Sequence, residues 1–276
     1  MRGLARSEAR AAELRGIGIE PVIGTLDDTA LLSAESASAD AVVNAASADH
    51  RPAAEAILAA LAGTGKPFLH TSGSSIVGNR AGGEARDDVY DETTPLTPAL
   101  NRAARVALNQ DILAGAEKGV RAVVLCPALI YGLGHGIEPH SMQVPWLIAL
   151  ARKYGVAKHA GPGANIWSNV HIDDLTALYL LALEKAPAGG VYFAENGENS
   201  MREVCVAIGR MLGHERDPEA MTMDEAADEW GEGPANDTMG SNSRVRAVAA
   251  RRDLGWNPGA PSLLDEIERG CYAGNA

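Results

Sequence analysis

The stretch KPFLHTSG, residues 66–73, is an apolar run that ends abruptly in small and hydroxyl-bearing residues. We interpret it as a buried β-strand followed by a polar loop. Comparable runs precede it at residues 20–24 (EPVIG) and 39–47 (ADAVVNAAS), and another follows at residues 120–132 (VRAVVLCPALIYG). Strands about 25–35 residues apart, each followed by a helical stretch, predict βαβ units and therefore a parallel sheet with helices on both faces.

Composition and charge exclude several classes of function. The 276 residues carry 24 Lys and Arg against 36 Asp and Glu, and the net charge of −12 argues against a nucleic-acid partner, which needs a concentrated basic surface. The longest apolar run, near residues 120–133, is interrupted by Arg121 and Pro127 and is too short to cross a bilayer. The three widely spaced cysteines match no metal-ligand pattern and predict the reduced thiols of a cytoplasmic protein with no metal site.

The strand–helix rhythm changes after about residue 134, which divides the chain into two expected parts. Residues 1–133 are predicted to form the parallel α/β domain. Residues 134–276 are predicted to form mostly a smaller lobe, with some segments that return to the core. Because open α/β sheets bind ligands at the carboxyl ends of their strands, we expect the lobe to lie over that edge.

Four motifs, in this order, carry a family resemblance. They are HTSGSSIVG (residues 70–78), LCPALIYGLG (125–134), WSNVHIDDLTALYLLALE (167–184) and NSRVRAVAARRDLGWNP (242–258). Together they resemble the atypical and extended short-chain dehydrogenase/reductases, the NAD-dependent epimerase/dehydratase-like group, over nearly the whole chain. The resemblance implies a doubly wound, Rossmann-type sheet in residues 1–133 and a substrate-binding α/β lobe in most of residues 134–276.

The first residues, MRGLARSEAR, match the second strand of that family rather than its first. The family's Gly-rich turn, whose backbone N–H groups hold the dinucleotide pyrophosphate, lies about 30 residues before this segment. The resemblance therefore implies a truncated fold that lacks the first strand and the Gly-rich turn. A truncated or misassigned start is the favoured explanation, and a natural lack is the alternative.

The resemblance also implies where a dinucleotide, NADP or NAD, would bind. Arg6 and Ser7 match the end of the second strand, where an Arg can pair with the 2′-phosphate of NADP. The alternative for these two is a surface arginine beside a helix-capping serine. The other implied cofactor contacts are Thr25, Leu26, Asn44, Ala45, Ala46, Thr71, Pro127, Ala128, Leu129 and Ile130.

The implied catalytic residues depart from the family pattern. The position of the hydroxyl that polarises the substrate oxygen falls on Gly73, with Ser72 before it and Ser74 and Ser75 after it as candidates. The family's Tyr-x-x-x-Lys pair falls on Asn101 and Arg105, and a register shifted by two residues offers only alanines. Arg105 could still hold a ribose hydroxyl or a phosphate, whereas an amide has no tunable pKa for proton exchange.

Several residues of the second half are further candidates. Tyr131 and His135 are conceivable replacements for the missing phenol, although a tyrosine at position 131 most often packs beneath the substrate loop. Trp167, His171, Gly73, Tyr131 and His135 are expected to line the substrate site. Asp173 or Asp174 is expected to cap the helix that follows.

The resemblance implies NAD(P)-linked oxidation, reduction, epimerisation or dehydration of a small carbonyl or alcohol, and it allows a homodimer. The altered Tyr and Lys positions favour a rival interpretation, a non-catalytic protein that senses a dinucleotide or a metabolite with the same fold. A third alternative is an inactive fragment. Whether the chain is an enzyme therefore stays open at this point.

Overall fold

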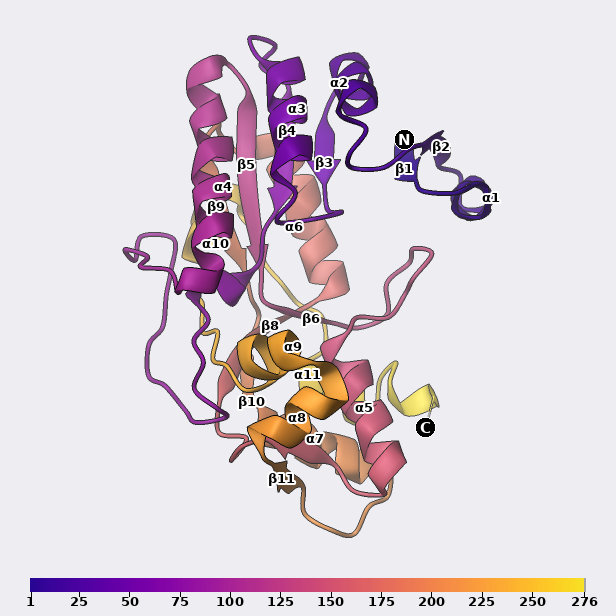
Figure 1. Ribbon diagram of the computed structural model, residues 1–276, viewed down its shortest axis with the longest axis vertical. Helices are drawn as coiled ribbons and strands as arrows, with labels where there is room; N and C mark the ends of the chain where they lie inside the picture. The colour runs from indigo at the N-terminus through magenta and orange to yellow at the C-terminus, as the bar shows by residue number, and fades with distance from the viewer. Residues whose placement is uncertain (276) are drawn as a thin grey trace.

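The computed structural model describes residues 1–275, and it confirms the α/β class with a parallel central sheet (Figure 1). Four parallel strands stand in the order β3-β4-β5-β9. Their bounds are Val42–Asn44 (β3), Pro67–Thr71 (β4), Arg121–Pro127 (β5) and Gly190–Ala194 (β9). β5 is buried at every position after Arg121, as expected for a central strand that is covered on both faces.

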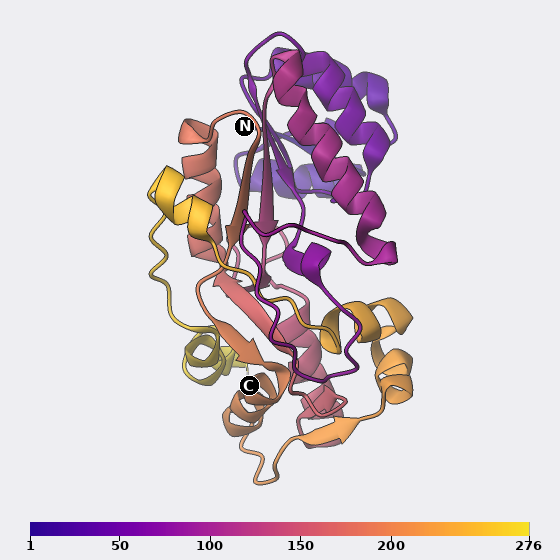
Figure 2. The ribbon, with the colours of Figure 1, turned by 90° about the vertical axis from the view of Figure 1, so that its left-hand side faces the viewer.

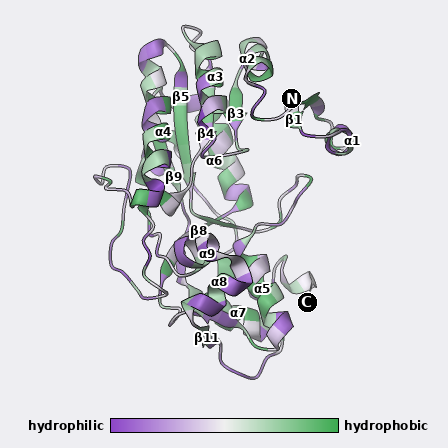
Figure 3. Cartoon of the chain, in the orientation of Figure 1, coloured by the Kyte–Doolittle hydropathy of each residue, from purple (hydrophilic) through white to green (hydrophobic). Residues whose placement is uncertain are grey.

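Helices cover both faces of this sheet (Figure 2). One face carries α3 (Arg51–Leu61) and α4 (Ala103–Leu113), with α2 (Thr29–Ser38) packed beside α3. The other face carries α6 (Ile172–Lys185) and α10 (Val248–Leu254). Figure 3 shows the hydrophobic colour concentrated along β3 and β5, where these layers meet. The core is built mainly of Ala, Val, Leu and Ile, because the chain holds only two Phe.

The first residues form a small unit beside this sheet. β1 (Arg2–Ala5) and β2 (Glu20–Ile23), joined by α1 (Glu8–Gly16), make a separate two-stranded parallel sheet (Figure 1). The expected lack of a first strand is not supported, because the described residues open with a strand that pairs with β2. The turn after β1 contains no glycine, and the Ser7 hydroxyl caps α1 by accepting from the N–H of Arg10 at 3.3 Å.

The second lobe lies below the carboxyl ends of the central strands (Figure 1). Its three-stranded sheet has the order β10-β8-β6, with β6 (Leu129–Tyr131), β8 (Ile166–His171) and β10 (Glu198–Ser200). A two-stranded sheet pairs β7 (Lys158–Ala160) with β11 (Glu219–Met221). The helices of this lobe are α5 (Gln143–Tyr154), α7 (Met201–Met211), α8 (Met223–Trp230), α9 (Glu232–Pro234) and α11 (Leu263–Glu268).

Short helical turns complete the chain. They are η1 (Ser74–Val77), η2 (Leu100–Arg102), η3 (Ala114–Lys118), the π-turn η4 (Ala235–Met239) and η5 (Ala273–Asn275). The chain enters the second lobe at β6 and returns to the central sheet through α6, β9 and α10. This return places the loops of both lobes against the carboxyl ends of β3, β4 and β5.

Residues 242–247, the first part of the last of the four motifs, are not helical. Within residues 242–258 only Val248–Leu254 forms an α-helix. Ser243 instead forms a bridge with Trp167 of β8, and Val245 forms a bridge with Tyr90. These backbone partners come from distant parts of the chain, so helical periodicity alone could not reveal the extended segment.

Candidate functional site

The carboxyl ends of β3 and β4 bring two polar side chains together. Asn44 and His70 stand opposite each other in the parallel ladder, and both are buried. The Asn44 Nδ2 lies 3.1 Å from His70 Nδ1, and its Oδ1 accepts from the N–H of Ala46 at 3.2 Å. Burial lowers the pKa of His70 to about 4, so its imidazole is neutral near pH 7. Asn44 therefore shapes the loop after β3, which contains Ala45 and Ala46.

Arg105 lies over this loop from α4. Its Nε donates to Asp49 Oδ1 at 2.7 Å, its Nη2 donates to Asp49 Oδ2 at 2.5 Å, and its Nη1 donates to Ser75 Oγ at 3.0 Å. This guanidinium, bonded to both carboxylate oxygens, holds the pKa of Asp49 below its usual range. A Cβ built on Gly73 would lie 3.9 Å from Arg105 Nη1. The structure therefore brings Gly73, Ser75 and Arg105 to one place.

Two of the three candidate serines, Ser72 and Ser74, are engaged elsewhere. Ser72 is buried and its Oγ accepts from Asn109 Nδ2 at 2.8 Å, while the Oγ of Ser74, which is also buried, lies 2.7 Å from Ser243 Oγ. Ser75 is thus the hydroxyl beside Arg105. Asn109 was not among the predicted residues, and the available signal was its position four residues after Arg105 on the same helix face. The Oδ1 of Asn109 is buried without a hydrogen-bond partner among the described residues.

Asn101 and Tyr131, the two positions considered for proton exchange, lie in different surroundings. Asn101 is exposed in η2, close to Asp237 of η4, whose pKa is lowered above all by its hydrogen bonds from Arg80 and least by Asn101. Tyr131 is fully buried, and its hydroxyl donates to the carbonyl of Pro261 at 2.8 Å. Burial raises the pKa of the Tyr131 phenol well above its ordinary value. The structure does not bring these two residues together.

Four of the five residues expected to line a substrate site lie on β6, on β8 or in the loop after β6, whereas Gly73 lies beside Arg105. Tyr131 packs edge to face on His171, with ring centroids 5.3 Å apart. His135 is exposed, and its Nε2 lies 3.1 Å from Asp173 Oδ1. Trp167 is buried, and its indole N–H donates to the carbonyl of Ser241 at 2.8 Å.

The helix cap of α6 was predicted wrongly. His171 is the N-cap, because its Nδ1 accepts from the N–H of Asp173 at 3.2 Å. Asp174 instead accepts from the backbone N–H groups of Gly259 and Ala260, at 2.9 and 3.1 Å. A carboxylate between a strand and a helix is typical of a helix cap in sequence. The N–H groups that Asp174 binds belong to Gly259 and Ala260, which lie about 85 residues further along the chain.

We expect Asp174→Ala to lower the free energy of unfolding by about 1.5 kcal/mol, because two N–H groups lose a charged acceptor. Asp173→Ala, which removes an exposed pair with His135, is the matched control and should cost less than about 1 kcal/mol. Urea unfolding of both variants measures the difference. Equal losses in the free energy of unfolding would show that the hydrogen bonds of Asp174 with residues 259–260 stabilise the fold no more than an exposed ion pair does.

The remaining cofactor candidates have the following contacts. Arg6 is exposed. Thr25 bonds Asp28 through both its N–H (2.6 Å) and its hydroxyl (3.1 Å), and Thr71 Oγ1 lies 2.6 Å from the hydroxyl of Tyr179 on α6. The roles of Arg6, Ser7, Thr25, Leu26, Thr71, Pro127, Ala128, Leu129 and Ile130 toward a cofactor stay predictions.

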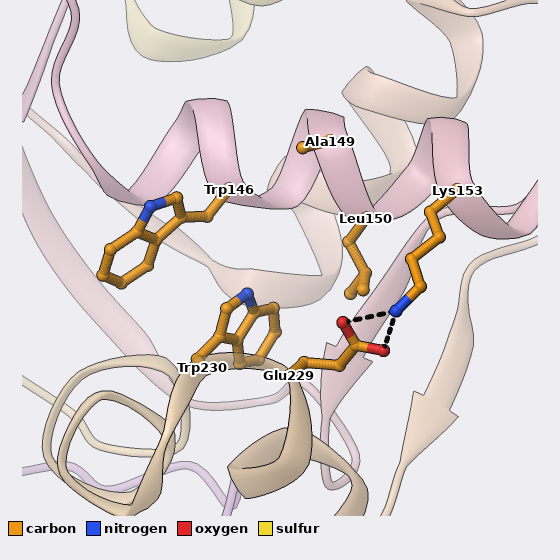
Figure 4. Close-up of a pocket in the computed structure, with 6 residues that line it drawn as sticks. All are labelled: Trp146, Ala149, Leu150, Lys153, Glu229 and Trp230. Carbon is orange, nitrogen blue, oxygen red and sulfur yellow. Dashed lines mark hydrogen bonds and ion pairs between the residues drawn. The ribbon is translucent and has the colours of Figure 1, made fainter.

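A separate hollow of about 380 Å³ lies between α5 and α8 (Figure 4). Its lining residues are Trp146, Ala149, Leu150, Lys153, Glu229 and Trp230. The ion pair between Lys153 Nζ and Glu229, at 2.7 and 2.9 Å, closes one end. None of the predicted site residues lines it. Among residues 1–275 no group of three or more His, Cys, Asp or Glu is arranged to hold a metal ion, and no helix is long and apolar enough to cross a bilayer.

Comparison with known proteins identifies relatives along the whole chain. The chain is 32% identical to the oxidase ucsJ of an Acremonium species, over 96% of this chain and 87% of that protein. It is 30% identical to an uncharacterised protein of Schizosaccharomyces pombe, over 98% of this chain and 90% of that protein.

Among solved structures, the dTDP-glucose 4,6-dehydratase DesIV from Streptomyces venezuelae, with NAD and TYD bound, is similar with a TM-score of 0.74 at 20% identity. The similarity covers 99% of this chain and 87% of that one, and at this identity it shows the fold alone. Residues 2–194 match the family described as NAD dependent epimerase/dehydratase, so the expected truncation is not shown. The chain belongs to the NAD dependent epimerase/dehydratase family.

Proposed function

We propose that the chain is an NAD(P)-linked oxidoreductase-like protein that acts on a small carbonyl or alcohol at the carboxyl ends of β3, β4 and β5. The observation that carries the proposal is the placement of Arg105 beside Gly73 and Ser75 at those strand ends. Two curated relatives are named for redox activity, the oxidase ucsJ and a quinoline-1-oxide ketoreductase of Stigmatella aurantiaca that is 27% identical over 71% of this chain. DesIV, which shares the fold, holds NAD.

The strand ends offer surroundings that fit a dinucleotide. Ala45, Ala46 and Ala128 present only methyl groups, which lets a ring approach the backbone closely. The buried Asn109 Oδ1, which has no partner among the described residues, would accept one hydrogen bond from a group that enters the site. When bound, the nicotinamide would supply or accept a hydride.

The side chains around this position can stabilise charge on a substrate oxygen. The hydroxyl of Ser75 can donate a hydrogen bond to that oxygen, and the Arg105 guanidinium beside it favours developing negative charge. A guanidinium keeps its proton at any ordinary pH, so Arg105 orients and stabilises rather than exchanging a proton. The reaction that these residues support best is therefore a reduction or oxidation whose proton comes from elsewhere, such as solvent.

A second candidate function is non-catalytic sensing of a dinucleotide or metabolite by the same site. Two observations favour it, because neither side chain considered for proton exchange is suited to it. Asn101 is an exposed amide, and the phenol of Tyr131 is buried with its hydroxyl bonded to the carbonyl of Pro261. Calorimetric titration of the 276-residue chain with NAD and with NADP tests both candidates, followed by absorbance assays with small aldehydes, ketones and alcohols. Binding with turnover supports the oxidoreductase, and binding without turnover supports the sensor. A lack of binding overturns the oxidoreductase and the sensing of a dinucleotide.

We expect NADP to bind more tightly than NAD if Arg6 contacts the 2′-phosphate. Arg6→Ala should then weaken NADP binding by about 1.5–3 kcal/mol, as for other hydrogen bonds to charged groups, and leave NAD unchanged. Arg15→Ala is the matched control, because Arg15 is an exposed arginine of the same small unit, paired only loosely with Glu8 at 3.7 Å. Equal affinity for the two dinucleotides, or no effect of Arg6→Ala, would contradict the assignment.

A further inference from the structure

Three arginines and two aspartates meet where the two lobes join. Arg80 follows η1, Arg102 ends η2 and Arg105 lies on α4, all in the first lobe. Asp49 follows β3, whereas Asp237 belongs to η4 of the second lobe. Arg105, Asp237, Asp49 and Arg80 are the charged groups that influence Arg102 electrostatically. Arg80 is in turn influenced by Glu232, so the wider cluster holds three positive and three negative charges.

Both carboxylates are already occupied by other arginines. Asp237 accepts from Nε of Arg80 at 2.7 Å and from its Nη2 at 3.1 Å. Asp49 accepts from Nε and Nη2 of Arg105, at 2.7 and 2.5 Å. Each aspartate thus uses both of its oxygens on a single guanidinium, which is the strongest arrangement for such a pair.

Arg102 is the arginine of this cluster that has no carboxylate partner among the described residues. Among residues 1–275 it forms no ion pair within 4.0 Å, and its one hydrogen-bond contact is from Nη2 to the carbonyl of Asp237 at 3.5 Å, which is long for a hydrogen bond. The residue is only partly exposed. Burial, followed by the repulsion of Arg105, lowers the pKa of Arg102. A partly buried guanidinium without a counter-charge is a poor structural element but a suitable receptor for an anion.

We propose that Arg102 binds an oxyanion, a carboxylate or phosphate group, of the ligand that this protein takes up between its lobes. A planar guanidinium matches both groups with two parallel N–H···O bonds. That the oxyanion belongs to the substrate rests on the proposed function, whereas anion binding by Arg102 does not.

The experiment titrates the full chain with inorganic phosphate and, separately, with acetate at constant ionic strength, and follows the Nε–Hε signals of arginine by NMR. Arg102→Gln should weaken binding of the preferred anion about 10-fold or more, as loss of a charged hydrogen-bond pair does. Arg102→Lys should retain part of the affinity. Arg210→Gln is the control, because Arg210 lies in the second lobe, its side chain is 70% exposed and it is paired with Glu268. The two anions distinguish a phosphate-bearing ligand from a carboxylate.

Anion binding that is the same in Arg102→Gln and in the unaltered chain would overturn the inference, as would an equal loss in Arg210→Gln. NAD is titrated in parallel to separate the two proposals. If NAD fails to bind while anion binding depends on Arg102, the proposed function fails and the inference stands. If NAD binds and Arg102→Gln leaves anion binding unchanged, the inference fails alone.

Discussion

The 276-residue chain is expected to reduce small carbonyls about 10²–10⁴-fold more slowly than a double variant carrying Asn101→Tyr and Arg105→Lys, both at saturating dinucleotide. The factor is the usual contribution of a positioned general acid or base. The amide of Asn101 cannot exchange a proton with a tunable pKa, and Arg105 keeps its proton. The variant supplies a phenol at position 101 and a lysine ammonium one helical turn away, which lowers the pKa of a neighbouring phenol.

The measurement is the change in dinucleotide absorbance with a panel of aldehydes and ketones. Asn101→Phe with Arg105→Lys is the matched control, because it adds the ring without the hydroxyl and should stay slow. Rapid turnover by the unaltered chain would show that another group donates the proton. Tyr131→Phe then decides whether the buried phenol has that role despite its bond to the carbonyl of Pro261.

Glu198→Gln is expected to lower the free energy of unfolding at pH 7 by about 1–2 kcal/mol, which is less than the full linkage between pKa and stability would give, because solvent screens these partly exposed pairs. Glu198 accepts from Arg244 at 2.7 and 3.1 Å and from Arg246 at 3.0 Å. These hydrogen bonds, from Arg244 above all, lower the pKa of Glu198 from 4.5 to about 2. Its side chain is 27% exposed, so solvent screens the pairs only partly.

The sign of the pH dependence follows from the lowered pKa. The ionised form is favoured in the folded state, so its stabilisation is fully present above the unfolded pKa of 4.5 and is lost as the pH falls toward about 2. Urea unfolding at pH 7 and pH 3 should therefore show a smaller gap between the unaltered chain and Glu198→Gln at pH 3. Glu138→Gln is the control, because Glu138 is 74% exposed and paired with Arg10. A gap that does not change with pH would contradict the argument.

The sequence predicted well those features that depend on local pattern. The apolar runs around Phe68 and Val123 are buried strands of a parallel sheet, because residues covered on both faces must be apolar throughout. The end of the strand before Ser72 and Gly73 was also predicted from its small and hydroxyl-bearing residues, whereas Arg105 was named only through the family resemblance. Family membership also follows from these local motifs.

The partners of individual polar side chains could not be predicted in this way. Asp174 was predicted as a possible helix cap, yet its carboxylate accepts from the backbone N–H groups of residues 259–260. The bond from the hydroxyl of Tyr131 to the carbonyl of Pro261 had no signal in the sequence. Each of these contacts joins residues more than 80 positions apart, and no periodicity within a segment encodes such a distance.

The sequence by itself determined the α/β class and the family, because both depend on patterns of neighbouring residues. Only the tertiary structure decided which charges are satisfied. Arg105 and Arg80 obtain carboxylate partners from different lobes, whereas Arg102 obtains none within 4.0 Å among residues 1–275. The physical reason is that ion pairing depends on distances of a few ångströms between side chains, and folding sets these distances across the whole chain.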